Sequence, residues 1–256
     1  MTQTFPHQLN RTVVIGALPD VVFRFFTDSQ RWASWWGAGS TIDPKPGGQV
    51  LVRHPNGIEM IGEVLEITPP DRLSFTYGYA SGTPVAPGQS RVTVRLEPVP
   101  EGTRLHLRHE FADADAAEHH VQGWRYQLSL FGNAVANEVH ADAASVADRW
   151  FSVWSNPDGN ARDAELQTLV SPNVRMRDRF SLILGASDLR EHLAAVHRFM
   201  PGMTLTRDGD VRHCQGVVLA DWLAKSADGQ VRGKGTNVFE LSAHNQVESV
   251  TGLWAG

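Results

Sequence analysis

Residues 103–135 combine a strictly alternating stretch with a helical apolar stripe. In residues 103–111, apolar side chains and His109 share one face and charged side chains share the other, as in a half-buried strand. Beyond it, apolar residues from Trp124 to Val135 recur at helical spacing, which predicts an amphipathic helix that begins near Gly123. We expect this helix to lie on the sheet, with Trp124 and His109 in one buried layer.

The remainder of the first half predicts further strands and one short helix. Residues 12–16 read as a strand, and Pro19 then opens a helix. Antiparallel strands follow at 49–54, 58–67, 72–79 and 90–97, each bounded by glycine, proline, asparagine or aspartate. Alternate residues of these strands then face the apolar stripe of the helix, and this arrangement predicts an apolar pocket between them. Its predicted lining is Trp36, Phe75, Tyr77, His109, Trp124 and Leu128.

Several segments of this half occur in the order of a known family. They are ALPDVVFRFFTD, WWG, PGGQV, GEVLEITPPDRLSFTY, VTVRLEP, GTRLHLRHEF and GWRYQLSLF. Residues 10–136 thereby resemble the START-like (SRPBCC) superfamily, in the branch of homologues of the heat-shock-protein ATPase activator. The resemblance implies a helix-grip fold whose long last helix closes a hydrophobic cavity, and a binding protein more than an enzyme.

The second half reads as a different module. Helices are predicted at 142–156, 164–170 and 187–200, and strands at about 203–213, 216–225, 231–241 and 246–254. Helices followed by strands favour an α+β cone with a curved antiparallel sheet. The chain therefore divides into a first domain over residues 1–137 and a second over residues 138–256, as its length also suggests.

This half also resembles a known family. The segments SVADRWFSVWSN, LQTLVSPNVRMRD, LGASDLREHL and GKGTNVFELSAHNQVESVTGLW are similar to the SnoaL-like branch of the nuclear-transport-factor-2-like superfamily, over about residues 141–255. That superfamily includes isomerases, cyclases, hydrolases, dehydratases and binding domains without catalysis. The fold alone does not choose among them.

Three polar groups of the second half interrupt its apolar faces. Asp178 shares a strand face with Val174, Met176 and Phe180, where an unpaired carboxylate is costly. Asn237 has the same parity as Phe239 and Leu241, and Trp150 points inward from the first helix, where Trp154 joins its stripe as a predicted ligand contact.

The resemblance extends to these three positions. In the steroid isomerases of the superfamily, Asp178 falls at the proton-shuttling carboxylate, Trp150 at a tyrosine hydroxyl and Asn237 at a protonated aspartate of the oxyanion hole. No tyrosine follows Tyr126, so the strongest oxyanion donor of those enzymes is missing here.

Structural roles compete with these functional interpretations. Asp178 could belong to a hydrogen-bond network or pair with an arginine, and Asn237 could be a satisfied polar core group. The tryptophans could serve the core, and His109 could be a neutral buried histidine. His119-His120 and the pair His192 and His197 lack metal-ligand spacing, so no metal and no cofactor are expected.

Charge and composition limit the classes of partner that the chain is expected to bind. Residues 1–136 hold 11 lysines and arginines against 13 aspartates and glutamates, and residues 137–256 hold 12 against 15. This even balance implies no basic face, so nucleic acid is not expected as a partner. There is no apolar run of membrane-spanning length and no hydrophobic signal core, and Cys214 is a single cysteine. A cytoplasmic protein without membrane contact is expected.

Three functions stay open on this basis. The first is a two-domain protein that binds apolar small molecules in a cavity of each domain. The second is a SnoaL-like isomerase, cyclase or hydrolase with Asp178 as its general base. The third is a chaperone-associated stress protein, which the family of the first half suggests. Strands 216–225 and 246–254 carry apolar residues of both parities, and a homodimer through the second domain is predicted from them.

Overall fold

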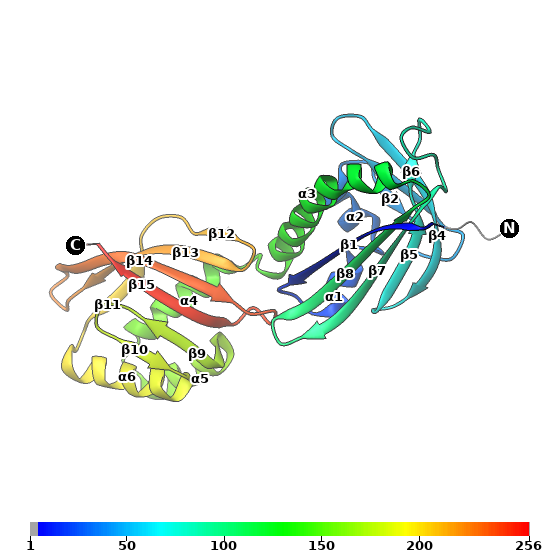
Figure 1. The fold of residues 1–256 in the computed structure, drawn as a ribbon. Coiled ribbons are helices and arrows are strands. Elements are labelled where there is room, and N and C mark those ends of the chain that lie inside the picture. The colour runs from blue at the N-terminus through cyan, green and yellow to red at the C-terminus, as the bar shows by residue number, and fades with distance from the viewer. Residues whose placement is uncertain (1–4, 256) are drawn as a thin grey trace. The chain divides into compact units, whose positions relative to one another are not determined.

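The computed structural model describes residues 5–255, which divide between Glu138 and Val139 into two compact units. Each unit combines helices with a β-sheet, and the predicted α+β class is confirmed (Figure 1). Helix α3 (Ala114–Val139) ends at this division, and helix α4 (Ala143–Ser155) opens the second unit. No helix within the described residues is long and apolar enough to cross a membrane.

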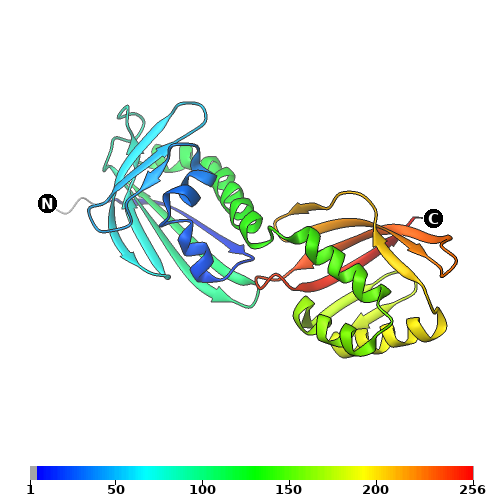
Figure 2. The same ribbon diagram turned by 180° about the vertical axis from the view of Figure 1, so that it is seen from behind.

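The first unit is built on an antiparallel sheet with helices packed on one face. Its strands are β1 (His7–Ile15), β2 (Thr41–Ile42), β3 (Gln49–Arg53), β4 (Glu59–Thr68), β5 (Arg72–Thr76), β6 (Gly78–Tyr79), β7 (Ser90–Val99) and β8 (Gly102–Phe111). The strand order is β1-β8-β7-β5-β4-β3-β2, with β6 paired to β4. Helices α1 (Pro19–Arg24) and α2 (Ser29–Trp36) connect β1 to β2, and the view from behind shows them beside the sheet (Figure 2).

Helix α3 starts nine residues earlier than its apolar stripe predicts. It begins at Ala114 because residues 114–117 are rich in alanine, the strongest helix former, and Asp115 complements the positive end of the helix dipole. His119 and His120 therefore lie on the helix, where their side chains diverge. His120 is buried and His119 is exposed.

The core of the first unit is dominated by aromatic side chains from α1, α2, α3 and the sheet. Trp32 and Trp35 of α2 pack edge to face with ring centroids 5.1 Å apart, and Trp35 contacts Phe131 of α3 at 5.0 Å. Asp28 caps α2 by accepting a hydrogen bond from the backbone N–H of Arg31 at 2.8 Å. This packing holds α3 against the sheet.

The second unit places three helices against a curved sheet. Helices α5 (Gly159–Leu169) and α6 (Ala186–Phe199) accompany α4, and the strands are β9 (Val170–Arg177), β10 (Leu182–Leu184), β11 (Thr204–Arg207), β12 (Arg212–Cys214), β13 (Val217–Lys225), β14 (Val231–Leu241) and β15 (Val247–Trp254). The order is β10-β9-β15-β14-β13-β11, with β12 paired to β13. Within the predicted antiparallel sheet, β15 and β9 pair in parallel.

Two details of the second unit differ from the sequence prediction. The strand expected at 203–213 is two short strands, because a turn at Gly209, with φ of 84°, separates β11 from β12. Strand β9 ends at Arg177, since Asp178 closes a turn by accepting from the backbone N–H of Phe180 at 2.7 Å. Phe180 consequently leaves the buried face on which it was placed and is 71% exposed.

Candidate functional site

A cavity of about 420 Å³ lies between the helices and the sheet of the second unit. Its wall is mostly apolar, with Met176, Val196 and Leu205 among the lining side chains. The volume falls within the range of about 300–1,000 Å³ that is typical of small-molecule sites. A few polar groups interrupt this wall, and they decide what the cavity can recognise.

All four residues that the sequence singled out in this unit line the cavity: Trp150, Trp154, Asp178 and Asn237. They come from three elements far apart in the chain, namely α4, the turn after β9, and β14. Trp150 and Trp154 lie one turn apart on α4, and their ring centroids are 6.0 Å apart. The fold therefore brings together the groups whose spacing and parity suggested a site.

The two tryptophans of α4 present unused hydrogen-bond donors. Trp150 is 1% exposed and Trp154 is 6% exposed, yet neither indole Nε1 has a hydrogen-bond partner among the described residues. A buried N–H group without an acceptor costs about 1–3 kcal/mol. Both N–H groups would gain an acceptor from a cavity occupant that carried an oxygen.

Asn237 is held in a defined orientation by a tryptophan of the neighbouring strand. Trp222 Nε1 donates to Asn237 Oδ1 at 3.0 Å. An indole nitrogen can only donate, so the amide oxygen of Asn237 faces Trp222 and its Nδ2 donors remain for another acceptor. Asn237 is 5% exposed, and it can therefore act as a buried donor at the cavity wall.

The carboxylate of Asp178 lines the cavity and is held by hydrogen bonds and not by an ion pair. Besides the N–H of Phe180, it accepts a hydrogen bond from Trp254 Nε1 at 3.3 Å. It forms no ion pair with any arginine or lysine of the part of the chain that the structure describes. The side chain is half-buried, so it can reach an occupant of the cavity.

Gly252 separates Asp178 from Asn237. It pairs with Asn237 across β14 and β15, and a Cβ atom at this position would lie 3.0 Å from Asp178 Cβ and 3.4 Å from Asn237 Oδ1. The contact at 3.0 Å is tighter than ordinary van der Waals packing. The missing side chain therefore lets the carboxylate and the amide approach one another.

Sequence reasoning missed Trp222 and Trp254 as members of this site. It assigned both to apolar strand faces, one of which was expected at a dimer interface. Trp222 shares its parity with Val218 and Ala220, which are also buried, and this phase indicates an inward position. Trp254 donates to Asp178 only because β15 pairs with β9, a parallel pairing that the sequence pattern does not reveal.

The six residues predicted to line a pocket in the first unit are all buried and lie together between α3 and the sheet: Trp36, Phe75, Tyr77, His109, Trp124 and Leu128. The aromatic members contact one another directly. Trp36 and Trp124 have ring centroids 5.6 Å apart, and Tyr77 and His109 are 5.4 Å apart. A ligand entering here would have to displace aromatic side chains.

A chain of hydrogen bonds crosses this aromatic cluster. Trp124 Nε1 donates to His109 Nδ1 at 2.9 Å, and His109 Nε2 lies 2.8 Å from Ser90 Oγ. The Ser90 hydroxyl in turn donates to the backbone carbonyl of Tyr77. The inward His109 is thus satisfied on both ring nitrogens.

Burial shifts the titration of the groups in this cluster. It lowers the pKa of His109 well below its ordinary value, and the neighbouring His120 adds to this effect. Burial also lowers the pKa of His120 and raises that of the Tyr77 hydroxyl above its usual range. At neutral pH the three side chains are uncharged.

Two polar atoms of the first unit's aromatic region are unpaired. Trp36 Nε1 and His120 Nε2 are buried and make no hydrogen bond within residues 5–255. The described residues also include no group of three or more histidine, cysteine, aspartate or glutamate side chains that could hold a metal ion.

Residues 17–136 match the family model of the Activator of Hsp90 ATPase homolog 1-like protein, which confirms the resemblance predicted for the first half. No curated protein matches the chain. Similar solved structures include a SnoaL-like family protein from Agrobacterium tumefaciens (20% identity, 44% of this chain and 97% of that chain, TM-score 0.43). A protein from Mesorhizobium loti is 23% identical, over 50% of this chain and 96% of that chain, with a TM-score of 0.46. A protein from Chromobacterium violaceum is 24% identical, over 51% of this chain and 97% of that chain, with a TM-score of 0.43.

Proposed function

We propose that the second unit binds an apolar small molecule that carries at least one hydrogen-bond acceptor, such as a ketone. The observation that supports this most strongly is the pair of buried, unpaired indole N–H groups of Trp150 and Trp154 at the cavity wall. An apolar wall favours a hydrophobic body, and fixed donors select an oxygen at one end of it. Asn237 supplies a third donor to the same space.

A matched pair of probes tests this assignment. Benzophenone carries a carbonyl oxygen, and diphenylmethane has nearly the same shape without it. Trp150→Phe should weaken the binding of benzophenone by about tenfold, the cost of one buried hydrogen bond, and leave diphenylmethane nearly unchanged. Equal losses for both probes would assign Trp150 to packing alone.

Two controls accompany that comparison. Tyr126→Phe removes an exposed polar group from α3 of the first unit and should change neither affinity. Native mass spectrometry of freshly purified protein should show an apolar molecule that co-purifies with the chain and is lost on mild activation. A protein that binds neither probe and carries no such molecule would contradict the proposal.

A second candidate function is catalysis in the same cavity with Asp178 as general base. Its support is a half-buried carboxylate that has no ion-pair partner among the described residues and lines the same cavity as Asn237 and Trp150. A base at this position could remove a proton next to a carbonyl, while Asn237 and Trp150 donated to the developing oxyanion. A binding protein needs the donors but not the base.

We also propose a second apolar site in the first unit, between α3 and the sheet. Its support is the unpaired Trp36 Nε1 and His120 Nε2 within this buried aromatic cluster. Benzophenone should then bind with two equivalents per chain. Ala224→Phe, which fills the second unit's cavity, should leave one equivalent, whereas loss of all binding would restrict the function to the second unit.

Self-association through the second unit is a further part of this proposal. Val217 and Leu253 are 38% and 55% exposed on β13 and β15, and Leu219 lies opposite Val238 between them. Covering these apolar side chains with a second copy would remove them from water. Light scattering at micromolar concentration should give the mass of a dimer, and a Leu253→Lys variant should give that of a monomer.

A further inference from the structure

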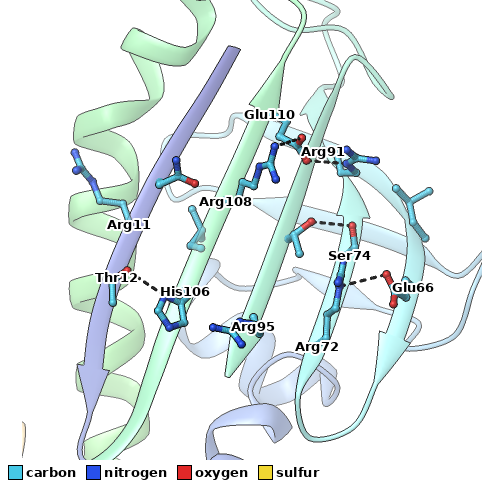
Figure 3. Close-up of a pocket in the computed structure, with 14 residues that line it drawn as sticks. Arg11, Thr12, Glu66, Arg72, Ser74, Arg91, Arg95, His106, Arg108 and Glu110 are labelled. Carbon is cyan, nitrogen blue, oxygen red and sulfur yellow. Dashed lines mark hydrogen bonds and ion pairs between the residues drawn. The ribbon is translucent and has the colours of Figure 1, made fainter. Parts of the chain in front are cut away.

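The outer face of the first unit's sheet, opposite α3, carries a groove of about 720 Å³ (Figure 3). We call it the arginine groove, because five arginines line it: Arg11, Arg72, Arg91, Arg95 and Arg108. Two glutamates, Glu66 and Glu110, are the acidic side chains in its wall. The groove therefore has an excess of positive charge in a chain whose net charge is −5.

The strand register aligns basic side chains directly across the sheet. Arg72 of β5 lies opposite Arg95 of β7, and Arg95 lies opposite His106 of β8. Side chains that pair in this way have Cβ atoms about 4.5–5.5 Å apart, and like charges at that spacing are destabilising. Such a row is favourable only with negative charge close to it.

The glutamates of the chain neutralise this row incompletely. Glu110 is shared by Arg91 and Arg108, at 2.9 Å from each. Glu66 pairs with Arg72 at 3.3 Å. Arg95 reaches only the more distant Glu97, at 3.7 Å, and that carboxylate also accepts from His106 and lies near Arg104.

Polar hydrogen-bonding groups form the floor between the arginines. The hydroxyls of Ser74 and Thr93 lie 3.2 Å apart, and Ser74 lies between the labelled arginines of β5 and β7 (Figure 3). At the β1 side, Thr12 Oγ1 lies 3.2 Å from His106 Nδ1. Hydroxyls flanked by guanidinium groups suit phosphate or carboxylate oxygens.

We propose that the arginine groove binds a compact polyanion, a small molecule with two or more phosphate or carboxylate groups. A guanidinium presents a planar fork that matches both groups, and the strands that carry the arginines lie about 5 Å apart across the sheet. One anionic group would reach Arg95 and a direct neighbour, and several are needed to neutralise the row. This site lies in the first unit and is independent of the second unit's cavity.

The test uses the full chain with tripolyphosphate and citrate as probes in calorimetric titrations. At least one should bind with an affinity that falls as salt is added. Tighter binding of tripolyphosphate assigns the groove to phosphates, and tighter binding of citrate assigns it to carboxylates. Absence of binding by both, or binding of poly-glutamate peptide without either, overturns the proposal.

Variants distinguish binding in the groove from a general attraction of anions to positive charge on the protein. Arg72→Gln and Arg95→Gln should each weaken binding by about tenfold, as expected for loss of one charged hydrogen bond. Arg125→Gln removes the same charge from an exposed position on α3 and should change affinity by less than about twofold. Equal effects of the three would show attraction to net charge and overturn the site.

A variant that inserts a negative charge distinguishes loss of binding from loss of folding. Thr93→Glu places a carboxylate in the groove directly opposite Arg108 and two residues from Arg95 on β7. It should abolish binding of both probes and keep the melting temperature at or above that of the parent, because it neutralises the cation row. Retained binding with Thr93→Glu would overturn the proposal.

Discussion

The indole N–H of Trp124 donates to Nδ1 of His109 across 2.9 Å, from α3 to β8. Because an indole only donates, His109 Nδ1 must be unprotonated, so the imidazole is neutral and carries its proton on Nε2. That proton then points at Ser90 Oγ, 2.8 Å away, and the Ser90 hydroxyl donates to Tyr77. One contact thus sets the direction of the whole hydrogen-bond chain beneath the long helix.

The tautomer of His109 is directly measurable. Long-range ¹⁵N–¹H spectra at neutral pH should show His109 as the Nε2–H form, with a protonated Nε2 and a bare Nδ1. Trp124→Phe removes the donor and should release this tautomer preference. An Nδ1–H form or an imidazolium in the parent protein would contradict the assignment.

The same burial predicts how stability depends on pH. The pKa of His109 is lowered in the folded state, whereas an unfolded histidine titrates near 6.5. Its contribution to the free energy of unfolding is therefore complete above about pH 6.5. As the pH falls, the unfolded state binds a proton that the folded state refuses, and the contribution is lost by up to about 1.4 kcal/mol per pH unit.

Urea unfolding between about pH 7.5 and about pH 5 measures this slope. His109→Gln can still accept from Trp124 and donate to Ser90 but cannot ionise, so its unfolding free energy should fall less steeply with acidification. His119→Gln changes an exposed histidine of the same unit, on α3, and should retain the parental slope. An unchanged slope in His109→Gln would show that this side chain does not set the acid sensitivity.

The role of Asp178 is testable without knowledge of a natural substrate. If Asp178 is a general base, the protein should accelerate α-deuterium exchange of propiophenone in D₂O, and Asp178→Asn should reduce this rate by about a hundredfold or more. Binding of benzophenone and the melting temperature should change little. Asp208→Asn, an exposed carboxylate of the same unit, serves as the control.

If Asp178 is structural instead, the result inverts. Asp178→Asn then lowers stability, because the turn at Phe180 and the contact with Trp254 weaken, and no exchange above the buffer rate is seen in either protein. That outcome leaves a binding function for the cavity and excludes the catalytic candidate.

Gly252 offers a test of the spacing within the site. Gly252→Ala introduces a methyl group 3.0 Å from Asp178 Cβ, which should cost about 1–3 kcal/mol of stability and weaken ketone binding. Gly123→Ala is the matched control, because nothing lies within 4 Å of its new methyl group and it is in the middle of α3. That change should stabilise the first unit by about 0.5–1 kcal/mol.

The spacing of apolar residues within a single strand or helix predicted which side chains point into the core. His109 and Trp124 were placed in one layer, and Asp178, Asn237 and Trp150 were placed inward, from spacing and family resemblance. Each is a property of one strand or one helix. In the structure His109 and Trp124 are buried together, and Asp178, Asn237 and Trp150 line one cavity.

Features that depend on pairing between distant strands could not be predicted in this way. The partner of Asp178 is Trp254, which requires β15 to lie beside β9. Arg72 and Arg95 lie opposite one another because β5 pairs with β7. The even charge balance of the chain gives no sign of this pairing. A total of charges does not show how the charges are arranged on a sheet.

The most direct test of the central proposal follows the indole signals during ligand addition. Titration of ¹⁵N-labelled protein with benzophenone should shift the Trp150 and Trp154 indole N–H resonances saturably, in the downfield direction of a newly formed hydrogen bond. Diphenylmethane should perturb them without that downfield shift. Indole resonances of Trp150 and Trp154 that stay in place, while the ketone binds elsewhere or not at all, would contradict a ligand site in the second unit's cavity.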